Sequence, residues 1–170
     1  MFNRFFPDET ASSAYDIGYE ELYGRGVRGL IFDIDNTLVP HGAPADDRAK
    51  ALFKKLRTIG FRCYLISNNK EGRVRPFAKA VGAGFICNAH KPSAGGYMAA
   101  MKAMGTDKSS TVFIGDQLFT DVYGAKRAGI SNILVGQLHP KEEIQIVFKR
   151  KLEKIVLYFY KKDVGRQKNS

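Results

Sequence analysis

The stretch GLIFDIDNTLV, from Gly29 to Val39, constrains the fold of this chain more than any other. Three apolar residues, Leu30 to Phe32, predict the end of a buried strand, and two carboxylates, Asp33 and Asp35, follow it. Because side chains alternate along an extended backbone, both carboxylates are expected to reach one point beyond the strand. Open parallel sheets bind ligands at that edge. Two like charges held this close favour a divalent cation between them or a proton on one of them, and both outcomes suit phosphate chemistry.

Helical and strand patterns alternate through the rest of the chain. The strands are too continuously apolar to be exposed on either face, which predicts an α/β fold with a doubly wound parallel sheet. We expect Asp46 or Asp47 to cap the first helix of this region and Ser93 to cap the third. The predicted helices cover 48–59, 74–81, 93–104 and 121–128, and the predicted strands cover 61–66, 84–87, 111–114 and 130–135.

The chain divides into three predicted parts, namely a peripheral segment 1–28, a core 29–140 and a basic tail 141–170. The net charge is +10, and the tail holds nine Lys and Arg against four Asp and Glu. Such a patch is either a solvated surface or a contact for a polyanion, meaning an acidic lipid, a nucleic acid or a phosphorylated substrate. Apolar residues at near-helical spacing predict a basic amphipathic helix that either packs on the sheet or lies in a membrane interface; they are Ile144, Phe148, Leu152, Ile155, Val156 and Phe159.

Length and composition indicate one ordinary globular domain. A chain of 170 residues can bury about 70% of the surface that its unfolded form exposes. There is no apolar stretch of about 20 residues, and the start MFNRFFPDE does not resemble a secretory signal. Cys63 and Cys87 have no metal-binding spacing and are expected to be reduced core residues. We therefore expect a cytoplasmic protein without a disulfide.

Each predicted strand delivers a different polar group to the same edge of the sheet. Beyond the first strand these groups are Ser67 and Asn68 after the second, Lys91 in the loop after the third, and Asp116 with Asp121 after the fourth. Each alone has an ordinary explanation as a turn, surface or capping residue, but four successive strands rarely converge in this way by accident. His41 and His90 lie near the site in sequence, yet neither has a partner at metal-ligand spacing, and we assign them no role.

These elements resemble the four ordered motifs of the haloacid dehalogenase (HAD) superfamily of phosphatases. The matching residues are DIDNT at 33–37, Ser67, Lys91 with Pro92, and GDQLFTD at 115–121. The whole chain is similar to a capless branch of that superfamily, which includes phosphatidylglycerophosphate phosphatases. The resemblance implies a Rossmann-like core and a Mg²⁺-dependent phosphomonoesterase that works through an aspartyl-phosphate intermediate.

The resemblance also implies a role for each residue. Asp33 would be the nucleophile, Asp35 the general acid and then the base, and Lys91 a catalytic cation that also binds the substrate. Ser67 and Asn68 would bind the phosphoryl group. Asp33, Asp35, through its backbone carbonyl, and Asp116 would hold Mg²⁺, with Asp121 in support; hard oxygen ligands suit that ion.

The spacing of the motifs leaves no room for an inserted cap domain. An open site can admit a head group that projects from a membrane, which favours phosphatidylglycerophosphate or a similar lipid and a peripheral contact with anionic membrane. Two alternatives remain, namely a phosphatase for a soluble sugar phosphate, nucleotide or phosphoprotein, and a basic nucleic-acid or ribosome-associated binding protein. No nucleic-acid motif supports the latter. The sequence does not predict the oligomeric state.

Overall fold

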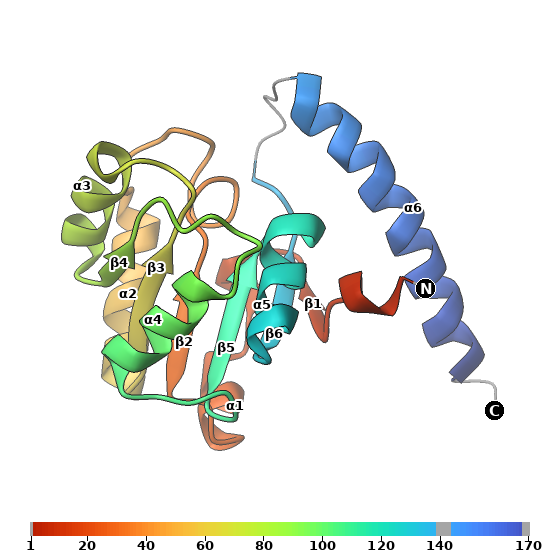
Figure 1. Cartoon of the computed structure of the whole chain (residues 1–170). Coiled ribbons are helices and arrows are strands. Elements are labelled where there is room, and N and C mark those ends of the chain that lie inside the picture. Colours follow the sequence, from red (N-terminus) through yellow and green to blue (C-terminus); the bar gives the residue numbers. More distant parts are fainter. Residues whose placement is uncertain (1, 139–143, 168–170) are drawn as a thin grey trace.

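The computed structural model describes residues 2–138 and 144–167, with side chains for 2–138 and 149–165. In this part of the chain one parallel sheet of six strands has the order β1-β6-β5-β2-β3-β4 (Figure 1). This confirms the predicted doubly wound α/β fold. The strands are β1 (Glu9–Ala11), β2 (Gly29–Phe32), β3 (Arg62–Ile66), β4 (Gly84–Ile86), β5 (Thr111–Gly115) and β6 (Ser131–Val135).

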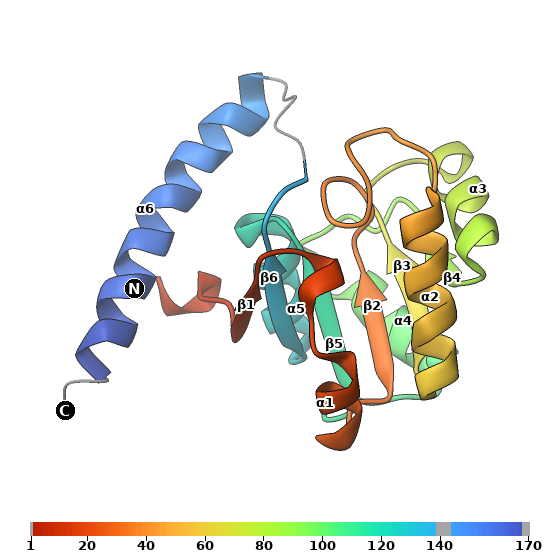
Figure 2. The ribbon, with the colours of Figure 1, turned by 180° about the vertical axis from the view of Figure 1, so that it is seen from behind.

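Helices cover both faces of the sheet, as Figures 1 and 2 show from opposite sides. Leu30 and Phe32 point to one face and pack with residues of α1, α2 and α3, whereas Ile31 points to the other and packs with residues of α4 and α5. Because successive side chains of β2 point to opposite faces of the sheet, this strand contributes residues to two separate hydrophobic cores. The helices are α1 (Tyr19–Gly24), α2 (Asp47–Ile59), α3 (Glu71–Val81), α4 (Gly95–Met104), α5 (Tyr123–Ala128) and α6 (Ile144–Gln167).

The register of the central strands brings the candidate site together. Phe32 of β2 pairs with Ile114 of β5 and with Leu65 of β3. The three strands therefore end at nearly the same level, and the residues after them, Asp33, Ser67 and Asp116, emerge side by side. In the described chain the connections after β2 and β3 lead directly into α2 and α3, so no cap domain is inserted there.

Of the two predicted helix caps, the one at the start of α2 is confirmed and the one at Ser93 is not. The side chain of Asp46 accepts a hydrogen bond of 2.8 Å from the backbone N–H of Ala49, and Gly60 ends α2 at a φ of 116°. The predicted cap at Ser93 is wrong. Helix α4 begins two residues later, and the backbone N–H of Ser93 instead closes a turn onto the carbonyl of His90.

The segment before residue 29 is less peripheral than the sequence indicated. Three of its residues form the edge strand β1, which pairs with β6 from Glu9↔Ile133 to Ala11↔Val135. Ala14 and Tyr19 are buried in the core. A strand of three residues is too short to show a period of two, which explains why its pattern gave no signal.

Helix α6 stands beside the β1 edge of the sheet (Figure 1). Its predicted start at residues 141–143 lies outside the described residues, as do the side chains of Ile144 and Phe148. Val156 is 3% exposed and packs with Leu118, Val122 and Leu134. The residues expected on one apolar side, Leu152, Ile155 and Phe159, are instead 43%, 51% and 44% exposed. The helix therefore has two apolar sides. One is packed, and the other is largely exposed, with the ring of Phe159 stacked on that of Phe2 at 5.8 Å between ring centroids. None of the described helices is long and apolar enough to cross a membrane.

Candidate active site

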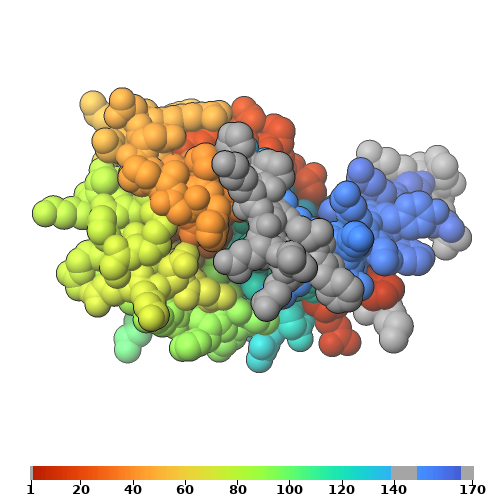
Figure 3. Space-filling view, turned by 90° about the horizontal axis from the view of Figure 1, so that it is seen from above, coloured from red at the N-terminus to blue at the C-terminus, as the bar shows by residue number. Residues whose placement is uncertain are grey.

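Three buried carboxylates meet at the carboxyl ends of β2 and β5. One oxygen from each of Asp33, Asp116 and Asp121 lies within 4.8 Å of the others. Nζ of Lys91 donates hydrogen bonds of 2.7 Å to Oδ1 of Asp33 and 2.7 Å to Oδ1 of Asp121. Segments from distant parts of the chain surround this edge, which Figure 3 views from above: the loop after β2 is orange, α3 is yellow to green, and α6 is blue and stands to one side.

The loop after β5 holds Asp121 in place through a close backbone approach. A Cβ built on Gly115 would lie 2.5 Å from Oδ2 of Asp121, so glycine is needed at this position. Asp121 lies in a π-helical turn, η3 (Leu118–Val122), which leads directly into α5. The predicted helix 121–128 is therefore present, with its first two residues in the π-helical turn. Oδ2 of Asp121 also accepts a hydrogen bond of 3.1 Å from the backbone N–H of Gln117.

The electrostatics of the cluster fit a divalent cation. Burial raises the pKa of Asp33 to about 7, against the lowering effect of Lys91, and burial likewise raises the pKa of Asp116. Although burial opposes its charge, Asp121 and Asp33 raise the pKa of Lys91. When all three carboxylates are ionised, they and the ammonium of Lys91 have a net charge of two negative charges. A divalent cation would neutralise this charge and would favour the ionised forms of Asp33 and Asp116. The donors are hard oxygen atoms, as such ions prefer.

The carboxylate of Asp35 has separate partners. Its oxygens accept hydrogen bonds of 2.8 Å from the backbone N–H of Gly42, 2.7 Å from Nδ2 of Asn69 and 2.8 Å from Arg73. Burial opposes ionisation, but Arg73 and Gly42 hold the pKa of Asp35 below its usual value. The three-carboxylate cluster does not include this side chain, although Asp33 and Asp35 line one small pocket of about 100 Å³.

The other predicted substrate-binding residues also line this pocket. Ser67 is 2% exposed, and its Oγ accepts a hydrogen bond of 3.1 Å from the backbone N–H of Asn69. Asn68 is bound to the backbone of Lys91, through hydrogen bonds of 2.7 Å to its N–H and 3.3 Å to its carbonyl, so this amide positions the lysine. His41 lines the pocket, whereas His90 is not among the described residues that do.

Sequence reasoning missed three side chains that orient the carboxylates. Asn69 and Arg73 bind Asp35, and Nε2 of Gln137 donates a hydrogen bond of 2.9 Å to Oδ2 of Asp116. Gln137 follows β6, and polar residues that follow parallel strands gather at one edge of the sheet. The reasoning that identified Ser67 would therefore have identified Gln137 too. Arg73 lies one turn into α3 and carries no such signal in the sequence.

Comparisons with known proteins agree with this fold. The HAD-hydrolase-like family matches residues 88–149. The probable phosphatase YqeG of Bacillus subtilis is 37% identical over 159 residues, covering 92% of each chain. Phosphatidylglycerophosphate phosphatase 1 of Arabidopsis thaliana is 28% identical over 158 residues, which cover 83% of this chain and 44% of that protein. A HAD phosphatase structure from Thermococcus onnurineus superimposes with a TM-score of 0.53 at 16% identity, covering 69% of this chain and 90% of that one.

The fold and these relatives define a phosphatase, that is, a hydrolase of phosphoric monoesters. The chain belongs to the haloacid dehalogenase superfamily, and it is similar to phosphatidylglycerophosphate phosphatases within it. Phosphatases of this superfamily use a divalent metal, and the buried cluster of Asp33, Asp116 and Asp121 is compatible with one.

Proposed function

We propose that this protein is a Mg²⁺-dependent phosphatase for a phospholipid such as phosphatidylglycerophosphate, and that it works through an aspartyl-phosphate on Asp33. The observation that carries the proposal is the buried cluster of Asp33, Asp116 and Asp121 around Lys91, with Asp35 in the same small pocket. In this proposal Mg²⁺ would be held by the carboxylates of Asp33 and Asp116 and the backbone carbonyl of Asp35, with Asp121 in support. When bound, Mg²⁺ would offset the charge of the phosphoryl group and of its nucleophile.

The reaction then has two steps. An oxygen of Asp33 attacks the phosphorus, the bond to the substrate alkoxide breaks, and Asp35 donates a proton to that alkoxide. A water molecule next attacks the acyl phosphate, Asp35 accepts its proton, and inorganic phosphate leaves with Asp33 restored. Lys91 offsets charge on Asp33 and on the transferring group, while Ser67 and the backbone amide of Asn68 contact the phosphoryl oxygens.

The ion pair between Asp35 and Arg73 favours the ionised form of Asp35, which suits the second step. The first step requires Asp35 to carry a proton, so a substrate that displaces Arg73 from this carboxylate would promote it. The role of Asp35 as an acid in the first step can be tested by comparing esters whose leaving groups need a proton with esters whose leaving groups do not.

A lipid substrate is supported by two features. The relative from Arabidopsis thaliana is named for phosphatidylglycerophosphate. Helix α6 also exposes Leu152, Ile155 and Phe159 together with Lys151, which is an apolar and basic face suited to peripheral contact with an anionic membrane.

The test is a panel of phosphate esters assayed with Mg²⁺ and with excess chelator. We expect hydrolysis only with Mg²⁺ and the highest kcat/KM for phosphatidylglycerophosphate in mixed micelles, above that for glycerol phosphate, sugar phosphates and nucleotides. Full activity in excess chelator would overturn the metal assignment. A higher kcat/KM for a soluble ester would overturn the lipid assignment and favour a soluble-substrate phosphatase, and salt-dependent RNA binding without hydrolysis would favour the nucleic-acid alternative.

Metal binding can also be followed without activity. Mg²⁺ should raise the melting temperature of the folded protein, because a ligand present at 100 times its Kd stabilises by about 2.7 kcal/mol. Asp116→Ala should abolish this shift. The control Asp47→Ala, at an exposed position at the start of α2, should retain it.

A further inference from the structure

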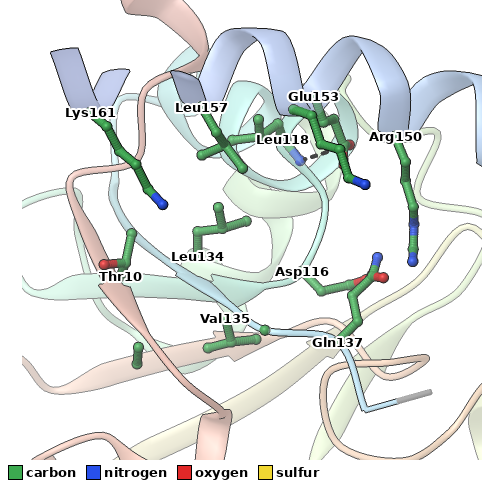
Figure 4. A pocket seen from close by; sticks show the side chains of 13 residues that line it. Thr10, Asp116, Leu118, Leu134, Val135, Gln137, Arg150, Glu153, Leu157 and Lys161 are labelled. Atoms are coloured by element: carbon green, nitrogen blue, oxygen red, sulfur yellow. Dashed lines mark hydrogen bonds between the residues drawn. The ribbon is translucent and has the colours of Figure 1, made fainter. Parts of the chain in front are cut away.

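A second cavity lies between α6 and the edge of the sheet. It is separate from the small pocket that Asp33, Asp35 and Ser67 line, which we call the phosphoryl pocket. Its volume is about 410 Å³, within the range of roughly 300–1,000 Å³ that ligand pockets occupy. Figure 4 shows α6 crossing over it, with Arg150 and Lys161 pointing into it at its two ends. Its apolar wall consists of Leu118, Leu134, Val135 and Leu157.

One end of the cavity is a carboxylate of the active site. Asp116 lines the cavity, and Gln137, which donates to Oδ2 of Asp116, lies at the same end beneath Arg150 (Figure 4). From there the cavity extends away from the site, along β6, to Thr10 of β1 and Lys161 of α6. Asp116 and Leu118 of this cavity flank Gln117, which lines the small pocket of Asp33 and Asp35, so the two cavities are neighbours on either side of the loop after β5.

The walls of the cavity are held by specific contacts. Oε1 of Glu153 accepts a hydrogen bond of 3.2 Å from the backbone N–H of Leu118, and this bond ties α6 to the turn that carries Asp121. Val156 packs beside it. Seven residues after Glu153, the ring of Tyr160 lies 5.1 Å from that of Phe6, measured between ring centroids. These contacts hold α6 at more than one point along its length.

The charges of the cavity favour an anion. Arg150, Lys154 and Lys161 line it, and within the described residues neither lysine takes part in an ion pair. Of the two acids that line it, Asp116 belongs to the metal cluster and Glu153 is bound to Leu118. An apolar wall beneath basic side chains is complementary to an amphiphile with a negative charge near its apolar chain.

We propose that this cavity binds the part of the lipid substrate that does not react, with the phosphodiester of an anionic glycerophospholipid near Arg150 and the start of one acyl chain against Leu134 and Leu157. This inference rests on the proposed function, because it assumes that the ester cleaved at Asp33 belongs to a lipid. It assigns substrate recognition to α6, which contributes no residue to the three-carboxylate cluster.

The chain contains no tryptophan, so a single introduced one is a clean reporter of where the lipid lies. Thr10→Trp places it at the far end of the cavity, and Leu152→Trp places it on the exposed face of α6 as a matched control. The probe is a short-chain phosphatidylglycerophosphate with brominated acyl chains, used below its micelle concentration and compared with the unbrominated lipid. Bromine quenches tryptophan on contact, so Thr10→Trp should lose most of its fluorescence and Leu152→Trp should keep it.

Kinetics provide a second readout. Leu157→Trp adds bulk to the wall of the cavity, and it should lower the ratio of kcat/KM for the lipid to kcat/KM for nitrophenyl phosphate about tenfold, mainly through KM. Tyr158→Trp, at a position of α6 that is 63% exposed and does not line the cavity, should leave this ratio unchanged. If Leu157→Trp does not fold, the double variant Lys154→Gln with Lys161→Gln, which adds no bulk, should lower the same ratio.

The outcomes separate this inference from the function on which it rests. Wild-type protein that hydrolyses nitrophenyl phosphate but not the lipid would overturn both. Lipid hydrolysis without quenching of Thr10→Trp, or with an unchanged ratio in the cavity variants, would overturn the cavity assignment alone. Quenching of Leu152→Trp in place of Thr10→Trp would also overturn it, because the lipid would then lie on the outer face of α6.

Discussion

The centre of the sheet and its α6 side are built in opposite ways. At the centre, the side chains of Asp33, Lys91 and Asp121 are only 9%, 5% and 1% exposed and are joined by hydrogen bonds of 2.7 Å. On the α6 side, Leu152, Ile155 and Phe159 are 43–51% exposed, and a small apolar cluster around Val156 attaches the helix. Charge is buried at the centre, and apolar surface is exposed at the side.

This difference indicates a division of work. Buried ion pairs contribute little net stability, since desolvation offsets their attraction, but they hold atoms in fixed positions. The centre is therefore suited to chemistry that depends on positioning. The exposed apolar face and the cavity of α6 are suited to contact with a larger molecule. Changes at the centre should abolish turnover of every ester, whereas changes on α6 should depend on the substrate.

The largest expected effect is that of Asp33→Asn, which tests whether the centre is needed for every substrate. The amide is a poor nucleophile and a poorer metal ligand, so we expect a loss on the order of 10⁴-fold or more in kcat for both lipid and nitrophenyl phosphate. The fold should persist, because Lys91 keeps its hydrogen bond to Asp121. Circular dichroism checks the fold, and turnover at the wild-type rate would remove Asp33 from the mechanism.

A smaller and more selective effect is expected for Asp35→Asn. Loss of a general acid and base costs about 10²- to 10⁴-fold, and the cost should be greatest for alkyl esters, whose leaving groups need a proton. Nitrophenyl phosphate should be affected less, because its leaving group departs as an anion. Initial rates on both esters provide the measurement. Equal losses on the two esters would argue that Asp35 does not act as an acid.

The smallest effect should come from the α6 side, through Glu153→Gln. Burial raises the pKa of Glu153 to about 7, above the value of about 4.3 for an exposed glutamate. The folded state therefore binds this proton more tightly, and the resulting stability is complete below about pH 4 and is lost as the pH rises through about 7. Glutamine does not titrate, so the variant should gain stability relative to the wild type over this interval.

Urea unfolding of both proteins on either side of this interval measures that change. Asp163→Asn, at an exposed position on the same helix, is the matched control. Hydrolysis of nitrophenyl phosphate should change little in Glu153→Gln, because this residue of α6 bonds the turn after β5 and lines the second cavity, not the pocket of Asp33 and Asp35. A difference in unfolding free energy that is the same at both pH values would show that Glu153 is not protonated more readily in the folded protein.

Local patterns in the sequence determined the elements and their order along the chain. Apolar strands alternating with amphipathic helices specify a parallel sheet with two covered faces, and Asp46 and Gly60 mark the ends of α2 as expected. The convergence of Asp33, Ser67, Lys91 and Asp116 also follows from the sequence, because the carboxyl ends of parallel strands share one edge. These features depend on neighbours within a few residues or on one rule of topology.

The tertiary structure alone decided which distant side chains meet. Asp35 is bound by Asn69 and Arg73, which are 34 and 38 residues away. The edge strand β1 forms because residues 9–11 pair with β6, which lies more than 120 residues later in the chain. The packed face of α6 was likewise decided by the turn after β5, since both faces of the helix are apolar and its spacing alone does not distinguish them. Such contacts depend on how the chain crosses the sheet, and a local pattern carries no information about that crossing.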